Sequence, residues 1–427
     1  MKLKRLLLAA PLAVLATFDV AHADLVAIRV GLAETASDGP IEHAVVLVED
    51  GKIVTVGQDL AIGRGIPVID RPDWVVMPGL VAAYSRLGLD SRAGDEFTPQ
   101  ATAKAELLPR TQAYDDVVEE GVTTLGLYPA GSGVAGQALV VRPSGDEKGE
   151  MILSSDAYLK MRFNSNAKSK KTLRDAFGKV DEYAEKLEKA REKYDKDVEK
   201  ASKKKKKSSK SKKDDDDDDK KKEEADDKGD EIGPFVPPEL PAEVEVFQRV
   251  REGALRVLFG IGKSADYLHL VKAIGDEEFD WSLRVRSTSQ LDIFYVLDKI
   301  AENAPFVLID PNLTLHPGTS RQRNIPMELA EAGARLVLLP RSDSTWGYER
   351  WRRDVGVLVS TGLDRQAAIQ AMTSNAAEFL GVNDRLGSLS AGMDANMIFL
   401  NGDPFEPGTQ IEAVMLEGEF VHGEVQQ

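Results

Sequence analysis

Short hydrophobic runs alternate with helical patterns along most of this chain. The runs are typical of buried strands and recur at 75–81, 123–128, 138–142, 157–163, 255–259, 282–286, 306–309 and 335–339. Patterns with helical spacing lie between several of them, at 267–274, 290–302 and 327–333. Strands that alternate with helices of this length form parallel βαβ units, and about eight such units close into a barrel. The pattern therefore predicts an α/β fold with a TIM-like (β/α)8 barrel.

The two ends of the chain carry a different pattern, in which apolar runs follow each other directly. Residues 44–57 form two such runs joined by a turn around Asp50 and Gly51, as in a β-hairpin. Residues 396–400 and 413–421 repeat this arrangement, so we expect both ends to pair into one small β-sandwich. The expected boundaries are 24–74 with 390–427 for the sandwich, and 75–167 with 234–389 for the barrel.

The first 23 residues have the pattern of a secretory signal peptide. A basic start is followed by an apolar stretch from Leu6 to Phe18, and small residues stand at Ala21 and Ala23. We therefore expect cleavage before Asp24 and export to the periplasm or the extracellular space. No later segment is long and apolar enough to predict a membrane span.

Residues 168–233 interrupt the barrel pattern with a highly charged insertion. Its first part, from Leu173 to Val198, has apolar residues spaced by three and four, which predicts an amphipathic helix. We expect the apolar stripe of this helix to pack on the protein's own body, with a coiled coil to a partner as the alternative.

The second part of the insertion consists of like-charge blocks, Lys203 to Lys207 and Asp214 to Asp219. Such blocks repel and bury no core, so we expect disorder from Ala201 to about Gly233. A solvated tether is the favoured interpretation. Recruitment of a protein partner, or binding of nucleic acid, calcium or a membrane surface, stays open.

The amino-acid composition limits the kinds of functional site that the chain can form. The 427 residues include no cysteine and five histidines, and the net charge is −16. The absence of cysteine excludes disulfides, thiolate zinc sites and cysteine nucleophiles. Outside the signal segment and the nearly neutral insertion, 29 basic and 49 acidic residues leave the body at −20. An acidic body argues against nucleic acid as the main partner.

Three passages, in this order and spacing, resemble the amidohydrolase superfamily, and its imidazolonepropionase-like members in particular. They are Val76-Met-Pro-Gly-Leu-Val81, Gly121-Val-Thr-Thr124, and Ala371-Met-Thr-Ser-Asn-Ala-Ala-Glu-Phe-Leu-Gly381 with the segments that follow it. The resemblance implies a barrel with a sandwich built from both chain ends. It also implies hydrolysis of amide or related C–N bonds with zinc or another divalent metal.

The resemblance also implies metal ligands, and this sequence departs from most of them. Tyr84 and Arg86 stand where the family has a His-x-His pair, and a guanidinium has no usable lone pair for a metal. Gly260 and Arg286 are the best matches for the histidines of strands five and six. Only the aspartate of the last strand is matched, by Asp343.

Two further positions complete the candidate site. Some relatives bridge two metals with a carboxylated lysine, and Arg142 or Lys160 would take that position here. His316 follows the seventh expected strand on the face where such barrels carry their active sites, although a structural role in the loop is favoured.

These departures lead to a hypothesis about the site. We expect no cofactor, and we expect Arg86 and Arg286 to enter the barrel mouth, with a guanidinium paired to Asp343. Such pairs either seal a dead site or leave surplus positive charge that binds an anion. The function expected is that of an exported, catalytically impaired binding or scaffold protein with a small anionic or amide ligand. The alternative is an active C–N hydrolase with a rebuilt site around Asp343.

Overall fold

The computed structural model describes residues 25–90, 94–211, 232–286, 292–423 and 425. It is a mixed α/β structure, which confirms the predicted fold class. The expected signal segment at 1–23 and the Asp214 to Asp219 block lie outside the described residues. Within the described part, no helix is long and apolar enough to cross a membrane.

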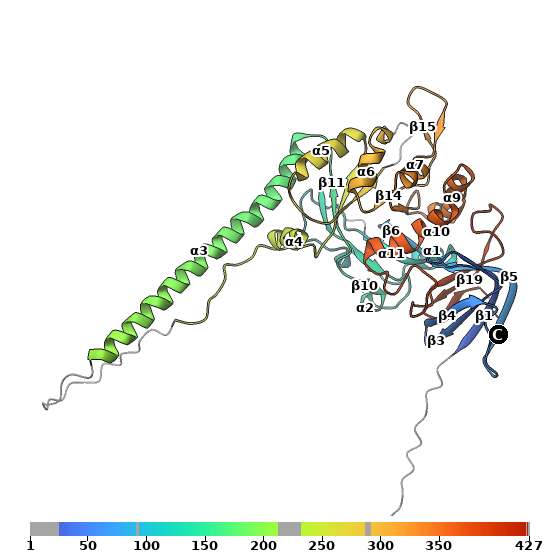
Figure 1. The fold of residues 1–427 in the computed structure, drawn as a ribbon, viewed down its shortest axis with the longest axis horizontal. Coiled ribbons are helices and arrows are strands. Elements are labelled where there is room, and N and C mark those ends of the chain that lie inside the picture. The colour runs from blue at the N-terminus through green and yellow to red at the C-terminus, as the bar shows by residue number, and fades with distance from the viewer. Residues whose placement is uncertain (1–24, 91–93, 212–231, 287–291, 424, 426–427) are drawn as a thin grey trace, which may run out of the picture.

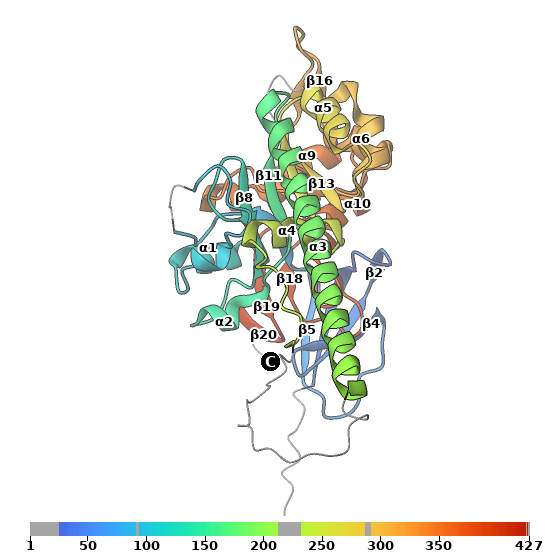
Figure 2. The same ribbon diagram turned by 90° about the vertical axis from the view of Figure 1, so that its left-hand side faces the viewer.

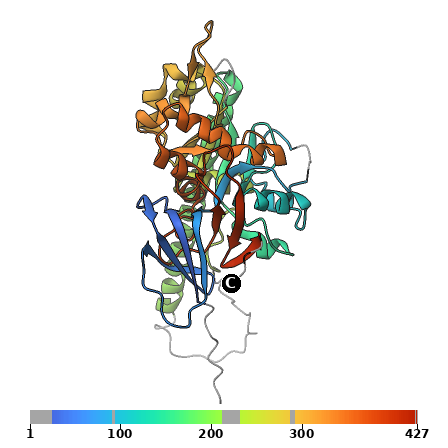
Figure 3. The same cartoon turned by 90° about the vertical axis from the view of Figure 1, so that its right-hand side faces the viewer.

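Both chain ends enter one eight-stranded sheet, which forms a β-rich module at one end of the molecule (Figure 3). Its strand order is β20-β19-β18-β5-β1-β3-β4, with β2 paired to β1. The join between the chain ends is the antiparallel pair β5 and β18, in which Met397 lies opposite Pro78. The strands are β1 (Val26–Glu34), β2 (Pro40–Glu42), β3 (Ala44–Glu49), β4 (Lys52–Gln58), β5 (Val68–Pro78), β18 (Met397–Leu400), β19 (Ile411–Leu416) and β20 (Glu419–His422).

Two further sheets form the body of the molecule. One has the order β10-β9-β7-β6, and the other has the order β17-β14-β13-β12-β11-β8. Strands β6 and β7 pair in parallel, and so do β11, β12, β13, β14 and β17. The antiparallel pairs are β8 with β11, β9 with β7, and β10 with β9. The strands are β6 (Leu80–Ser85), β7 (Val122–Leu127), β8 (Val134–Gln137), β9 (Leu139–Val141), β10 (Ile152–Ser154), β11 (Leu159–Arg162), β12 (Val257–Ile261), β13 (Trp281–Val285), β14 (Val307–Ile309) and β17 (Leu336–Leu338).

The two sheets surround a shared hydrophobic interior. Ala83 of β6, Leu258 of β12, Leu308 of β14 and Val337 of β17 belong to one buried cluster. Side chains of successive residues point to opposite faces of a strand, so the alternate residues of these strands pack outward against the helices. Strands from both sheets thus share one interior, although no hydrogen-bonded path among the described residues joins β6 to β17.

Helices cover the outer faces of this body (Figure 2). Most of them follow a strand and bury an apolar stripe, as the helical spacing in the sequence predicts. They are α1 (Gln112–Glu119), α2 (Lys148–Met151), α4 (Ala242–Arg251), α5 (Ser264–Ile274), α6 (Leu297–Asn303), α7 (Ile325–Glu331), α8 (Thr345–Glu349), α9 (Trp351–Ser360), α10 (Arg365–Met372) and α11 (Ser374–Leu380).

The insertion forms one long helix, α3 (Ala167–Ser211), which projects away from the body (Figure 1). The expected disorder from Ala201 onward is wrong for the first residues of this tract. Lysine is a good helix former, and a helix that has already nucleated adds residues at little cost, so the helix continues into the Lys203 to Lys207 block.

The apolar stripe of α3 meets two different surfaces. Near the body, Leu173, Phe177 and Val180 are buried against the core, as expected. Farther out, the stripe is covered by the returning chain instead, where the Tyr194 ring lies 5.4 Å from that of Phe235. The packing on the body therefore ends well before the helix does.

Candidate functional site

The C-terminal ends of β6, β7, β11, β12, β13, β14 and β17 open on one face, which we call the mouth. In parallel α/β structures, functional groups gather at this end of the strands because the loops there vary freely. Tyr84 lies within β6, Lys160 within β11 and Gly260 within β12, while Arg86 and Arg286 directly follow β6 and β13. Asp343 follows β17.

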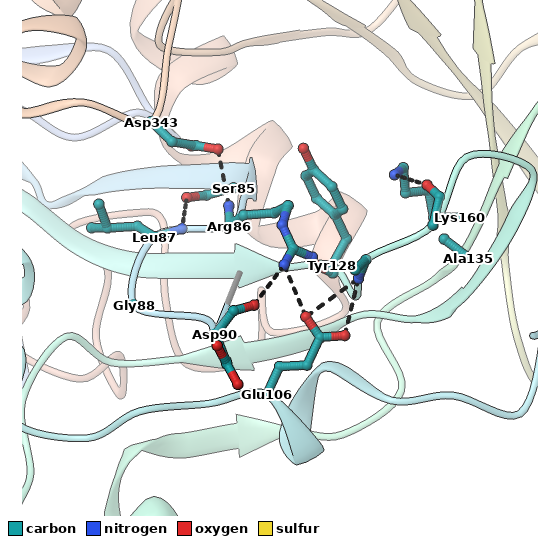
Figure 4. A network of polar contacts seen from close by, with 12 residues as sticks. Ser85, Arg86, Leu87, Gly88, Asp90, Glu106, Tyr128, Ala135, Lys160 and Asp343 are labelled. Carbon is teal, nitrogen blue, oxygen red and sulfur yellow. Dashed lines mark hydrogen bonds and ion pairs between the residues drawn. The ribbon is translucent and has the colours of Figure 1, made fainter. Parts of the chain in front are cut away.

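Asp343 is held at the mouth by hydrogen bonds, not by a guanidinium. It accepts from the main-chain N–H of Arg86 at 3.0 Å and from the hydroxyl of Tyr348 at 3.3 Å. The Arg86 guanidinium is turned away, and it donates to Glu106 at 2.9 Å and to the carbonyl oxygens of Tyr128 and Asp90 (Figure 4). The expected pair between a guanidinium and Asp343 is therefore wrong for Arg86, and no arginine of the described residues forms an ion pair with Asp343.

The surroundings of Asp343 favour its protonated form. Desolvation by the protein around it raises the pKa of this carboxyl, although the residue is open to solvent at the mouth. Hydrogen bonds from Ser85, from the main chain of Arg86 and from Tyr348 act in the opposite direction. The side chain can thus serve as a proton acceptor or donor nearer to neutral pH than a free aspartate.

A cavity of about 310 Å³ opens beside this carboxylate, between the ends of β6, β7, β11, β12 and β13. Tyr84 and Tyr128 line it together, with ring centroids 4.1 Å apart. Gly260 also lines it, and the one described atom that a Cβ there would meet is the Met161 carbonyl oxygen, at 3.9 Å. The small residue at Gly260 therefore leaves space at the position that the resemblance assigns to a histidine.

The charged side chains that line the cavity are all cationic among the described residues. Lys160, Arg162, Arg284 and Arg286 line it, and none of the described residues that line it is acidic. Arg284 is partly neutralised, because it forms an ion pair with Asp310 in which both side chains are nearly buried. Ion pairs are not found for Lys160, Arg162 or Arg286 within the described part of the chain, so a positive surplus faces the cavity.

Lys160 has an unusual environment for a lysine. Its Nζ lies 4.2 Å from the ring centroid of Tyr128 and donates to the carbonyl oxygen of Gly131 at 3.2 Å. Burial, helped by the positive charges of Arg86 and Arg162, lowers the pKa of Lys160 to about 8. The amine is therefore mainly charged at pH 7 and loses this charge within a mildly alkaline range.

Arg284 belongs to the site although it is not among the residues expected from the sequence. It lies on β13 two positions before Arg286, which directly follows the strand, and residues two apart in an extended segment point to the same face. The guanidinium of Arg284 lies over the ring of Tyr84, 5.5 Å from its centroid. Alternation along the run Leu283-Arg-Val-Arg286 could have shown that both arginines face the mouth.

Two of the candidate residues lie elsewhere. Arg142 pairs with Glu417 in the turn between β19 and β20, which connects the body to the β-rich module. His316 lies in the small hairpin formed by β15 (Thr314–Leu315) and β16 (Gln322–Arg323), with its ring centroid 4.9 Å from that of Phe294. Neither residue lines the cavity.

The residues at the mouth do not fit a zinc ion held as the resemblance implies. Zinc takes imidazole, carboxylate or thiolate ligands, whereas these positions offer a phenol, two guanidinium groups, a glycine and a single carboxylate. Within the described ranges, no three histidine, aspartate or glutamate side chains form a group that could hold a metal ion.

Comparison with known proteins supports the resemblance seen in the sequence. Residues 343–422 match the model of the amidohydrolase family, so the match begins at Asp343. An amidohydrolase from Thermotoga maritima MSB8 has 21% sequence identity and a TM-score of 0.71, with 93% of this chain and 100% of that chain covered. No curated protein matches the chain.

Two other solved structures of similar proteins contain zinc. An adenosine deaminase from Xanthomonas campestris with bound zinc has 15% identity and a TM-score of 0.46, covering 92% of both chains. Atrazine chlorohydrolase TrzN from Arthrobacter aurescens TC1, complexed with zinc, has 15% identity and a TM-score of 0.47, covering 93% of this chain and 95% of its own. The match of residues 343–422 to the amidohydrolase family, for which the resemblance implies a divalent metal, contradicts the expectation that no cofactor is involved, which is therefore withdrawn. The resemblance to the amidohydrolase superfamily is confirmed by the sequence of residues 343–422, and 93% of the chain shares the fold of the Thermotoga maritima amidohydrolase.

Proposed function

We propose that this protein binds a small organic anion, such as a carboxylate, in the cavity at the mouth. The observation that carries the proposal is that four cationic side chains line this cavity, whereas none of the described acidic residues does. Like charges that face one cavity repel each other, and an anion relieves this repulsion while it accepts their hydrogen bonds. From the N-terminal sequence alone, we further propose that binding takes place outside the cytoplasm.

The cavity suits a planar anion. Guanidinium groups present paired N–H donors that match the two oxygens of a carboxylate, and Arg286 has no ion-pair partner among the described residues. The stacked rings of Tyr84 and Tyr128 supply an apolar wall beside these donors. A site with a few fixed polar groups and an aromatic wall is typical of small-molecule recognition.

The test is calorimetric titration of the full chain with benzoate, comparing the wild type with Arg286→Ala. Loss of a charge-assisted hydrogen bond costs about 1.5–3 kcal/mol, so we expect affinity to fall by at least tenfold. Arg321→Ala removes an exposed arginine that does not line the cavity and is the matched control. Equal affinity in Arg286→Ala and the wild type would overturn the proposal.

Hydrolysis of a C–N bond is the second candidate function, and the environment of Asp343 favours it. Its raised pKa and its hydrogen bonds from Arg86 and Tyr348 are properties that suit a general base. Asp343 does not line the cavity, so a variant can separate the two functions. Asp343→Asn would abolish hydrolysis of a cyclic amide such as dihydrouracil, whereas binding of benzoate would persist.

A further inference from the structure

A second cavity of about 320 Å³ lies beside the first, between the base of α3 and the strands β8 and β11. The two cavities share four lining residues, Ser132, Met161, Arg162 and Asn164. They are therefore neighbours across the C-terminal end of β11. We call the first the inner cavity and the second the outer cavity.

The base of the charged insertion builds one wall of the outer cavity. Thr172, Asp175, Ala176 and Lys179 line it from successive turns of α3. The opposite wall includes Phe97, whose ring stacks on that of Phe247 at a centroid distance of 6.3 Å. The insertion thus contributes side chains to the rim of the proposed binding site.

The two cavities differ in charge. The inner one is lined by four cationic groups, of which Arg284 is paired with Asp310, and no acidic residue lines it within the described part of the chain. The outer one shares Arg162 with it and adds Glu96 and Asp175 against Lys168 and Lys179. Lys168 also forms an ion pair with Glu96. A ligand that occupied both cavities would therefore carry its negative charge at one end only.

The other walls of the outer cavity suit an uncharged body. Phe97 and the side chains of Val134, Met161 and Ala176 are apolar. Hydroxyl and amide groups of Ser132, Asn164 and Thr172 stand between them and can bond to a few polar atoms. Burial of apolar ligand atoms here would add affinity to that of the anionic end.

We propose that the two cavities form one elongated site, in which the inner cavity holds an anionic head and the outer cavity holds an apolar or aromatic body. The ligand class is an amphipathic organic acid that crosses the end of β11. This inference rests on the proposed binding of an anion in the inner cavity. It assigns a function to the base of α3, namely recognition of the ligand's body.

The experiment titrates the full chain with benzoate, 4-phenylbutyrate and 6-phenylhexanoate. Thr172→Trp fills the outer cavity from α3, and Ala184→Trp places the same side chain on an exposed part of that helix as the matched control. We expect affinity to rise at least tenfold along the series in the wild type and in Ala184→Trp. In Thr172→Trp this gain should disappear while the affinity for benzoate stays within twofold.

The outcomes separate the two proposals. In one outcome, benzoate binds and Arg286→Ala weakens its binding, but the longer acids bind no more tightly than benzoate, or their higher affinity persists in Thr172→Trp. The elongated site is then wrong, and anion binding in the inner cavity stands. If benzoate binds equally to the wild type and Arg286→Ala, the proposed function itself fails. Circular dichroism and a thermal melt of Thr172→Trp identify a folding defect, and Ala176→Leu then serves as a smaller obstruction of the same wall.

Discussion

The main-chain N–H of Arg86 donates a 3.0 Å hydrogen bond to Asp343, while the guanidinium of the same residue points to Glu106. Arg86 therefore has two separate structural roles, one through its main chain and one through its side chain. Its backbone fixes the carboxylate that follows β17, and its side chain closes the space beside Tyr128. Positive charge in the inner cavity consequently comes from β11 and β13, not from the end of β6.

The first prediction concerns the stability of Asp343→Asn. Folding raises the pKa of Asp343, so the folded state binds a proton more tightly than the unfolded state and is disfavoured when this group is ionised. The substitution should therefore stabilise the protein at neutral pH, by less than about 1 kcal/mol because the residue is solvent-accessible.

This gain should vanish as the pH falls below the unfolded pKa of aspartate, near 3.9, where the wild-type carboxyl is protonated in both states. Urea denaturation at neutral and acidic pH measures both values. A variant that is less stable than the wild type at neutral pH would contradict the prediction.

A second prediction uses the space beside Gly260. The one described atom that a Cβ there would meet is the Met161 carbonyl oxygen at 3.9 Å, so Gly260→Leu should be tolerated and should direct its side chain into the inner cavity. We expect binding of benzoate to fall more than tenfold with little change in the melting temperature. Gly408→Leu, at another unobstructed glycine, is the control and should bind as the wild type does. Unaltered binding to Gly260→Leu would show that the anion does not occupy this cavity.

A third prediction follows from the pKa of Lys160, which burial lowers to about 8. The amine loses its charge as the pH rises through this value, so the affinity for benzoate should fall between pH 7 and pH 9. In Lys160→Met, affinity should be weaker at pH 7 and nearly constant across this range. Titrations at several pH values measure the effect, and an equally steep fall in Lys160→Met would assign it to another group.

The features of the fold and the site differ in how far the sequence alone predicts them. Hydrophobic periodicity predicts the alternation of strands and helices and the hairpins at the two chain ends. Burial of one face of each strand or helix sets the spacing of its apolar residues. Asp343 is identified through the family resemblance, which implies an aspartate after the last strand of the barrel. The direction of the Arg86 guanidinium could not be predicted from the sequence. It depends on Glu106, which lies in a loop without a regular spacing of apolar residues.

The end of α3 shows a second limit. Repulsion between like charges predicted disorder from Ala201, yet the structure continues the helix to Ser211. The helix propensity of lysine and the nucleated helix before this tract outweigh that repulsion. Contacts between Tyr194 and Phe235, which are distant in sequence, could not be read from local spacing either.

A fourth prediction concerns the connection between the body and the β-rich module. Arg365 of α10 donates to Glu34 of β1, which is only 2% exposed. Arg365→Ala leaves this buried carboxylate without its partner and should cost about 3 kcal/mol of unfolding free energy. Arg353→Ala breaks an exposed pair with Glu349 and should cost less than about 1 kcal/mol. Denaturant unfolding that gives equal losses would show that the buried pair contributes no more than a surface pair.

The central claim, that the inner cavity is an anion site, is tested most directly by diffraction from crystals soaked in 4-bromobenzoate, recorded at the bromine absorption edge. The account predicts one bromine peak beside the rings of Tyr84 and Tyr128, with the carboxylate within hydrogen-bonding distance of Lys160 or Arg286. An empty inner cavity at a saturating concentration, or bromine bound only at other surfaces, would contradict it.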